Sequence, residues 1–342
     1  MRGIKAGVAI TGLILTLTAL LGLVVCLVVP LWGGRSANEA LRLNTILGVL
    51  VFVSGMVGLL LFFQGLNSLR GQPSKVFQLP PTWLLALLFA TILIIGETMR
   101  RIGLASAYLF PPFHIFAVSI PALAILSVAA RRWPGADWRT EVLQLAYGTI
   151  LAPALSAIAE FIGIFLVSTM TVSLTMVLPG GQARIQELMD LLSNPAILEQ
   201  PSAWVYLLSS PPMLIIVAAL VLFLGPLFEE AIKGLGVAFL SYRRPSRNEA
   251  ILWGLTCGLG FATVETAINV AILLDDWPVL IGLRLVTMAV HGVAGALMGL
   301  GWYHALVERR VPLLLAMYLL SVALHGIWNG AVAFLGFASL AF

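Results

Sequence analysis

Long runs of apolar residues constrain the fold of this chain more than any other feature. A helix of about 20 apolar residues crosses the roughly 30 Å of hydrocarbon in a bilayer. Nine runs suited to this task extend over about 7–29, 43–65, 82–99, 113–130, 143–177, 206–241, 250–273, 279–306 and 311–340. Because 60% of the 342 residues are hydrophobic and only 10% are charged, we predict an all-α polytopic integral membrane protein with about nine transmembrane helices.

The positions of the basic residues predict the orientation of the chain. With a cytoplasmic N-terminus, twelve of the nineteen Lys and Arg residues fall in inner loops, five in outer loops, and two, Lys233 and Arg284, inside spans. Short cytoplasmic loops are enriched in basic residues, so we expect a cytoplasmic N-terminus and a C-terminus outside. This pattern also accounts for the net charge of +4 without a nucleic-acid partner.

Polar character divides the chain into three predicted regions. Residues 1–178 hold five apolar runs and no motif that we can assign, and His114 is expected at the membrane interface. Residues 179–205 form the longest polar connection. Apolar residues recur there at helical spacing, at Ile185, Leu188, Met189 and Leu192. This spacing predicts an amphipathic connector helix lying in the interface. Residues 206–342 hold the last four runs.

The sixth run contains three charged residues within five positions, Glu229, Glu230 and Lys233. Placing a charged side chain at bilayer depth costs about 2.5–3.5 kcal/mol or more, so such residues are rare and usually functional. Lys233 follows Glu229 by four positions and Glu230 by three, which brings ammonium and carboxylates to one helix face. Pro226 removes a backbone donor just before the pair, and we expect a kink near Gly225–Pro226.

Titratable residues recur at one depth on the last four spans. Glu229 and Glu230 on the sixth span, Glu265 on the seventh, His291 on the eighth and His325 on the ninth each lie about twelve to fifteen residues from a predicted span end. At roughly 1.5 Å per residue, each reaches the middle of the bilayer. Since chance would scatter these groups in depth, their alignment predicts a common site.

Three further polar residues accompany this set. Asn269 follows Glu265 by four positions, and Asn329 follows His325 by four, so each pair shares a helix face. Interhelical Asn contacts are common in packing, and both residues are also candidates for orienting groups or stabilising an oxyanion. Arg284 precedes His291 by two turns, where it could neutralise a glutamate or hold a substrate carbonyl.

Carboxylates and imidazoles without a serine or cysteine nucleophile motif suit the activation of water. In one version His291, His325 and Glu265 bind zinc while another carboxylate acts as the base. In the other version no metal is bound, and a glutamate takes the proton from water. The sequence lacks HExxH, the motif that would make the metal specific. A proton-coupled transporter or channel using the same Glu, His and Arg residues is the alternative function.

Four motifs resemble those of the PrsW-type intramembrane proteases, and more distantly those of the CAAX prenyl proteases and the bacteriocin-processing proteases. The resemblance covers about 220–335. Its motifs are Glu229-Glu-Ala-Ile-Lys233 as EExxK, Phe261-Ala-Thr-Val-Glu265 as FxxxE, His291 with Arg284 upstream, and His325-Gly-Ile-Trp-Asn329 as HxxxD/N. Asn329 stands where an acid often stands in PrsW. Because Asn is a poor metal ligand, this position is more similar to the oxyanion position of the prenyl proteases.

The resemblance implies an intramembrane endopeptidase. It would cleave a peptide bond of a membrane-associated protein, with an anti-sigma-factor-like substrate, in a prokaryotic plasma membrane. Taken with the depth alignment, it makes Glu229 and Glu230 the general base and an orienting carboxylate, with Lys233 tuning their charge. Glu265, His291 and His325 complete a water-activating or zinc-binding centre, and a metal-free centre stays the alternative.

Overall fold

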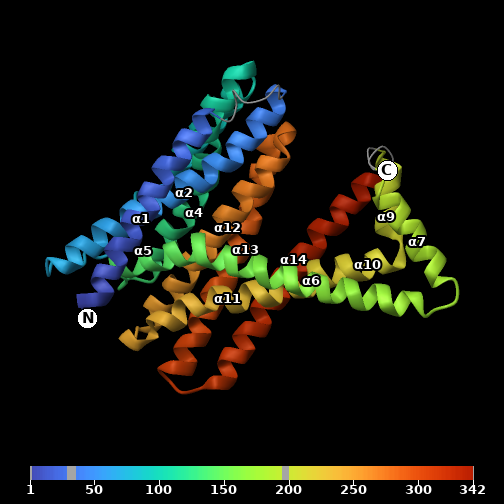
Figure 1. Ribbon diagram of the computed structural model, residues 1–342. Helices are drawn as coiled ribbons and strands as arrows, with labels where there is room; N and C mark the ends of the chain where they lie inside the picture. The colour runs from blue at the N-terminus through green and yellow to red at the C-terminus, as the bar shows by residue number, and fades with distance from the viewer. Residues whose placement is uncertain (1, 29–35, 195–199, 342) are drawn as a thin grey trace. The chain divides into compact units, whose positions relative to one another are not determined.

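The structure is a computed structural model, which describes residues 2–28, 36–194 and 200–341. Within these ranges the regular elements are helices, so the predicted all-α class is confirmed (Figure 1). Nine of the described helical segments are long and apolar enough to cross a membrane, as predicted. The orientation of the termini stays a prediction.

The helices follow one another through short connections. In chain order they are α1 (Arg2–Val28), α2 (Ala37–Leu69), α3 (Thr82–Arg100), α4 (Ser106–Arg132), α5 (Trp138–Ala146), η3 (Tyr147–Leu151), α6 (Ala152–Met176), α7 (Gly181–Leu192), α9 (Pro201–Ser209), α10 (Pro211–Ala218), η4 (Ala219–Leu224), α11 (Gly225–Leu240), α12 (Arg247–Ile272), α13 (Trp277–Leu306) and α14 (Val311–Ala341). The segments η3 and η4 are π-helical, and each joins its neighbours into one continuous helix.

The helices group into two compact units. The larger unit comprises Met1–Pro153 and Lys233–Tyr318, and the smaller unit comprises Ala154–Ile232 and Leu319–Phe342. Three helices, α6, α11 and α14, contribute residues to both units. The three regions proposed from the sequence stay predictions.

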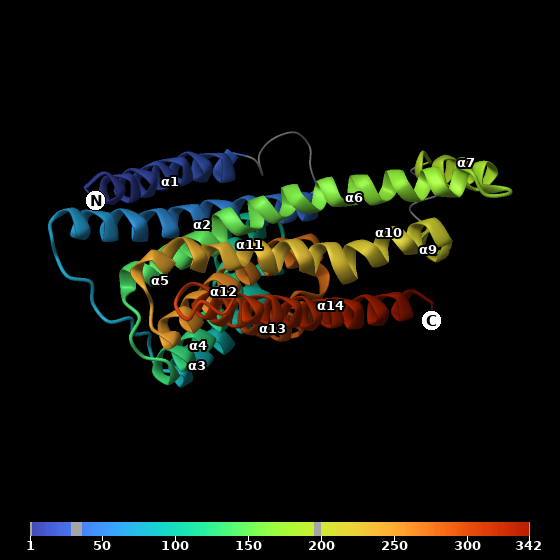
Figure 2. The same ribbon diagram turned by 90° about the horizontal axis from the view of Figure 1, so that it is seen from below.

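Helix α12 forms the centre of the larger unit. In its most apolar window 78% of the residues are buried, whereas the corresponding windows of α1, α2 and α3 are 11–22% buried. Helices α2, α4, α5 and α13 pack against α12 (Figure 2). An apolar side chain on an outer helix can face lipid, so the outer helices expose rows of Leu, Ile and Val while α12 does not.

A seam of glycines allows α12 and α13 to pack closely. Gly254 and Gly258 on α12 face Gly295 and Gly299 on α13. A Cβ atom on Gly254 would overlap the carbonyl oxygen of Gly295, so the two backbones are in direct contact. Small residues permit this approach between transmembrane helices, where dispersion contacts replace the hydrophobic effect as the main driving force.

His114 lies in the core of the larger unit and not near a helix end as expected, while its depth in the membrane stays a prediction. Helix α4 begins at Ser106, well before the predicted start at residue 113, so His114 lies two turns inside the helix. Its side chain is fully buried. Trp277 Nε1 can only donate, and it contacts His114 Nδ1 at 2.9 Å, so His114 Nε2 donates to the carbonyl oxygen of Ala267 at 2.9 Å. The histidine thereby links α4, α12 and the start of α13.

The sixth apolar run differs in detail from the single kinked helix predicted over 206–241. Ser210 precedes Pro211 and adopts an extended conformation, with φ −67° and ψ 136°, because a residue before proline disfavours the α region. Helix α9 therefore ends at Ser209 and α10 begins at Pro211. Near Pro226 the helix continues through the π-helical segment η4, and the expected kink near Gly225–Pro226 stays a prediction.

Both π-helical segments end just before a proline. Pro153 follows η3 by two residues and Pro226 follows η4 by two residues. Proline lacks an N–H group and its ring crowds the carbonyl four residues earlier. A π-helical turn widens the helix by one residue and accommodates this crowding without a break. The same local solution therefore appears once in each unit.

The predicted connector helix is present as α7. Ile185 and Leu188 are buried, while Met189 and Leu192 are exposed. The apolar face is thus half covered by the smaller unit, and the interfacial position of the helix stays a prediction. Residues 195–199 of the predicted connector lie outside the described residues.

Candidate active site

Two glutamates and a histidine come together in the smaller unit. Glu230 on α11 is completely buried, and its Oε1 lies 2.8 Å from Nδ1 of His325 on α14. Glu229 Oε2 lies 3.9 Å from the same nitrogen. Gly326 makes this approach possible, since a Cβ atom at this position would lie 2.6 Å from the carbonyl oxygen of Leu222. The sequence therefore folds so that α14 brings His325 onto the carboxylates of α11.

The ligand atoms of Glu229, Glu230 and His325 suit a metal ion. They all lie within 4.8 Å of one another and belong to buried residues. Tetrahedral zinc binds nitrogen and oxygen at about 2.0–2.2 Å, which places neighbouring ligand atoms about 3.3 Å apart. The distances of 2.8 and 3.9 Å from His325 Nδ1 bracket this separation. The three donors are therefore of a type and spacing that could hold a metal ion.

Asn329 contacts the backbone of the π-helical segment. Its Nδ2 donates to the carbonyl oxygen of Val221 at 3.3 Å. In a π-helix that carbonyl would accept from the residue five positions later, which is Pro226 and has no N–H. Asn329 supplies the missing donor. The side chain therefore holds α14 against η4, one turn beyond His325.

A second polar set lies in the larger unit, where His291 on α13 contacts Lys233 and Glu265. The Nζ atom of Lys233 lies 2.8 Å from His291 Nδ1, and Glu265 Oε2 lies 2.8 Å from His291 Nε2. An ammonium only donates, so His291 Nδ1 accepts from Lys233 and Nε2 carries the proton that faces Glu265. The two neighbours therefore fix both the orientation and the tautomer of the imidazole.

Glu265 is held in turn by two donors. Arg284 Nη1 contacts its Oε1 at 3.0 Å, and Asn269 Nδ2 contacts the same oxygen at 3.1 Å. The side chains of Glu265 and Arg284 are 30% and 27% exposed, whereas those of His291 and Lys233 are buried. The polar chain thus runs from a buried lysine to an accessible ion pair.

An aromatic ring completes this second set. The Nζ atom of Lys233 lies 4.6 Å from the centroid of the Phe261 ring, within the range of a cation–π contact. The same ring lies 5.5 Å from the His291 ring. Phe261 therefore stabilises a buried ammonium and covers one face of the imidazole, which gives the phenylalanine of the FxxxE pattern a physical role.

The structure groups the nine predicted site residues in two sets. Glu229, Glu230, His325 and Asn329 belong to the smaller unit, whereas Lys233, Glu265, Asn269, Arg284 and His291 belong to the larger unit.

Glu141 is a buried carboxylate that the sequence did not predict as a candidate residue, because it lies just before the predicted fifth span. Asp137 caps a helix that begins at Trp138, and this N-cap signal could have shown that Glu141 lies inside the helix.

The fold is that of an integral membrane protein, and the two polar sets place carboxylates and imidazoles among its apolar helices. These residue types are typical of an intramembrane hydrolase. Residues 191–342 match the family model described as PrsW family intramembrane metalloprotease. The match contains the four motifs, confirms the PrsW-type resemblance, and identifies the C-terminal part of the chain as an intramembrane peptidase that acts on membrane-protein substrates. It favours this function over a transporter or channel. Comparisons with curated proteins and with solved structures gave no match.

Proposed function

We propose that the chain is an endopeptidase that activates water at one centre formed by Glu229, Glu230, Glu265, His291 and His325. The buried contact between Glu230 and His325, beside Glu229, is the observation that carries the proposal, because it lies in the segment that matches the metalloprotease family. Helical spacing supports a single centre. Lys233, which contacts His291, follows the two glutamates by one turn of α11.

Different roles for the two adjacent glutamates follow from their surroundings. Glu230 is completely buried and contacts His325 directly, so it is placed to bind a metal ion together with that histidine. Glu229 is 9% exposed and lies farther from His325. We assign Glu229 as the general base, which takes a proton from the attacking water and passes it to the amide nitrogen that leaves. Water adds to the carbonyl carbon and forms the new C–O bond. The C–N bond then breaks as its nitrogen receives the proton that Glu229 took from the water.

His325, Glu230 and His291 are the residues that would hold zinc in this proposal, and at His291 Nδ1 the zinc ion would take the place that the Lys233 ammonium occupies. A zinc ion supplies Lewis-acid polarisation of the scissile carbonyl and lowers the pKa of water. Glu265 contacts His291 Nε2, as orienting carboxylates contact metal-binding histidines. Glu265 therefore orients His291 here, in place of binding zinc itself as first expected.

The remaining polar residues position these groups. Arg284 and Asn269 hold Glu265, and Lys233 balances the buried carboxylates. Asn329 anchors α14 to η4, which we propose in place of an oxyanion role. By its resemblance, the substrate is an anti-sigma-factor-like protein and the location is a prokaryotic plasma membrane.

The test combines metal content with cleavage by the purified full chain in liposomes. Single-span membrane proteins with a fluorescent tag at each end serve as substrates. We expect about one zinc per chain, loss of cleavage on chelation, and recovery with zinc. Glu229→Gln should bind zinc but cleave at least about 100-fold more slowly, since a general base contributes about 10²–10⁴-fold.

The matched control is Glu97→Gln, which removes a carboxylate paired with Arg100 and Arg101 at the end of α3. This variant should retain wild-type cleavage. Cleavage by metal-free protein would reject the zinc centre and leave a glutamate peptidase. Full activity of folded Glu229→Gln and His325→Ala would reject the assigned site altogether.

A further inference from the structure

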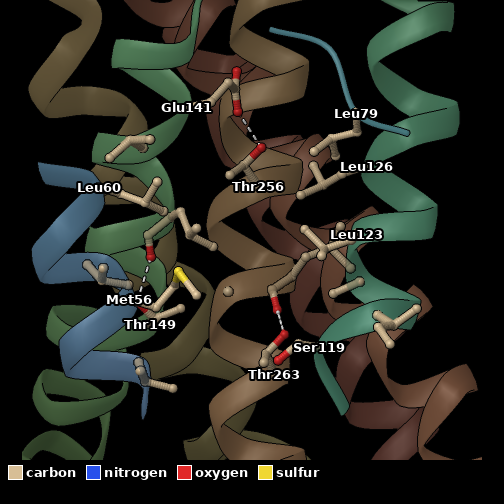
Figure 3. Close-up of a pocket in the computed structure, with 18 of the residues that line it drawn as sticks. Met56, Leu60, Leu79, Ser119, Leu123, Leu126, Glu141, Thr149, Thr256 and Thr263 are labelled. Carbon is tan, nitrogen blue, oxygen red and sulfur yellow. Dashed lines mark hydrogen bonds between the residues drawn. The ribbon is translucent and has the colours of Figure 1, made fainter. Parts of the chain in front are cut away.

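A cavity of about 330 Å³ lies inside the larger unit, among α2, α4, α5, η3 and α12. Its walls are mostly Leu, Phe, Val and Met side chains, and Figure 3 shows some of them, including Met56, Leu60 and Leu123. For comparison, a cavity of about 150 Å³ lined by apolar side chains binds benzene. The space is therefore suited to an organic molecule of roughly a dozen non-hydrogen atoms, and it falls within the size range of small-molecule sites.

The carboxyl group of Glu141 lines this cavity. Glu141 is 1% exposed, and the hydroxyl of Thr256 on α12 donates a hydrogen bond to its Oε2 (Figure 3). Within the part of the chain that the structure describes, Oε1 is buried without a hydrogen-bond partner. A buried carboxyl oxygen without a donor is costly, so this atom marks where a donor from a ligand would bind.

Two other polar side chains of the cavity wall, Thr149 and Thr263, do not fill this role. The hydroxyls of Thr149 and Thr263 donate to the carbonyl oxygens of Leu145 and Leu259 in their own helices (Figure 3). Among the described residues that line the cavity, none is basic. The charged groups whose fields act on Glu141 are two further carboxylates, Asp137 and Glu249. The surroundings of Glu141 therefore favour a donor, above all a cation, and repel an anion.

We propose that this cavity binds a small membrane-soluble amphiphile whose apolar body fills the space and whose hydrogen-bond-donating head, an ammonium or a hydroxyl, pairs with Glu141. The apolar walls select the body, and the single carboxyl selects the head. The inference is independent of the peptidase chemistry, since Glu141 belongs to neither polar set of the candidate active site.

The test uses the full chain in nanodiscs and three photoreactive probes that share one eight-carbon chain bearing a diazirine. The probes carry an amine, a hydroxyl or a carboxylate head. We expect saturable labelling by the amine and the alcohol at residues of α4 and α12 that line the cavity, mapped by mass spectrometry. Excess unlabelled octylamine should compete, and the carboxylate probe should label at least about tenfold less, since a charge-assisted hydrogen bond is lost and repulsion replaces it.

Two variants locate the site. Glu141→Gln keeps the shape and the contact with Thr256, and should weaken amine labelling about tenfold or more. Leu123→Trp fills the cavity from α4 and should abolish labelling, whereas the control Leu84→Trp, at a 41% exposed position on α3, should not. Equal labelling by all three heads, or labelling that does not saturate and spreads over lipid-facing helices, would overturn the proposal. Unchanged labelling of Glu141→Gln would overturn it as well, even if Leu123→Trp fails to fold.

Discussion

At the scale of single residues, His291 is oriented by one contact at each of its two ring nitrogens. Lys233 occupies one ring nitrogen and Glu265 the other. The carboxylate of Glu265 is itself held by Arg284 and Asn269. A histidine held in this way has one tautomer and one ring orientation, which is what a metal-binding or catalytic imidazole needs.

The first prediction concerns Glu265→Gln, which keeps the size of the side chain and removes its charge. Loss of an orienting carboxylate beside a metal-binding histidine costs about 10–100-fold in metal affinity or activity. We expect zinc affinity to fall by this factor, measured by competition with a chromogenic chelator. Zinc affinity and cleavage both equal to wild type would show that Glu265 only packs against its neighbours.

The sequence predicted a set of polar residues that the structure brings into two groups, but it did not predict their contacts, and their roles stay predictions. The charge and depth of Glu229, Glu230, Glu265, His291 and His325 selected all five. That Lys233 would contact an imidazole required knowledge of how α11 packs near α13, and helical spacing within one helix does not give this. The backbone contact of Asn329 was equally hidden, since it depends on a π-helical turn on another helix.

At the scale of helices, glycine and proline decide how close two backbones come and where a helix widens. The α12–α13 seam depends on glycines that a Cβ atom would disrupt, whereas Gly282 on the same α13 has open space around it. Gly254 on α12 and Gly282 on α13 are both helical glycines with different surroundings, so the two can be compared.

We predict that Gly254→Ala destabilises the protein, by about 1–3 kcal/mol, because the added methyl group overpacks the seam. Gly282→Ala should leave stability unchanged or raise it slightly, since alanine favours a helix by about 1 kcal/mol over glycine. Reversible unfolding in mixed micelles, followed by circular dichroism, measures both. Equal stability of the two variants would contradict the close packing of α12 and α13.

The π-helical turn before Pro226 yields a second test. Asn329→Leu should destabilise the protein by about 1–3 kcal/mol, because the Val221 carbonyl loses its donor. Pro226→Ala restores a backbone N–H that can replace this donor. The double variant should therefore lose less stability than the sum of the single variants. Strict additivity would show that the Asn329 amide and the proline are not linked.

At the scale of the whole molecule, the lengths of the apolar runs predicted nine helical segments that the described residues contain and that could cross a membrane. The apolar runs did not predict where the helices begin and end. Helix α4 begins well before its apolar run, and Ser210 separates α9 from α10. Hydropathy could not predict that the helices group into two compact units, with α6, α11 and α14 divided between them. A hydropathy profile indicates how deep a residue lies in the membrane but does not indicate which residues it contacts.

The predicted orientation of the whole chain, with the N-terminus in the cytoplasm and the C-terminus outside, can be tested by labelling. Single cysteines at Gln72 and Asp275 should react with a membrane-impermeant maleimide from opposite sides, Gln72→Cys from the cytoplasm and Asp275→Cys from outside. Both native cysteines, Cys26 and Cys257, are buried, so the unmodified chain supplies the low background. Labelling of both positions from one side would reject the orientation deduced from the basic loops.

The π-helical segment η4 also makes the pairing of α11 with α14 depend on a count of residues. A π-helical turn is an α-helix with one extra residue, and each residue advances the helix by about 100°. Removing one residue between Ala219 and Leu224 would rotate Glu229 and Glu230 by this angle away from His325, with every motif still intact. A chain with this one-residue deletion would therefore keep all the peptidase motifs in its sequence, but its carboxylates would not lie next to the histidine.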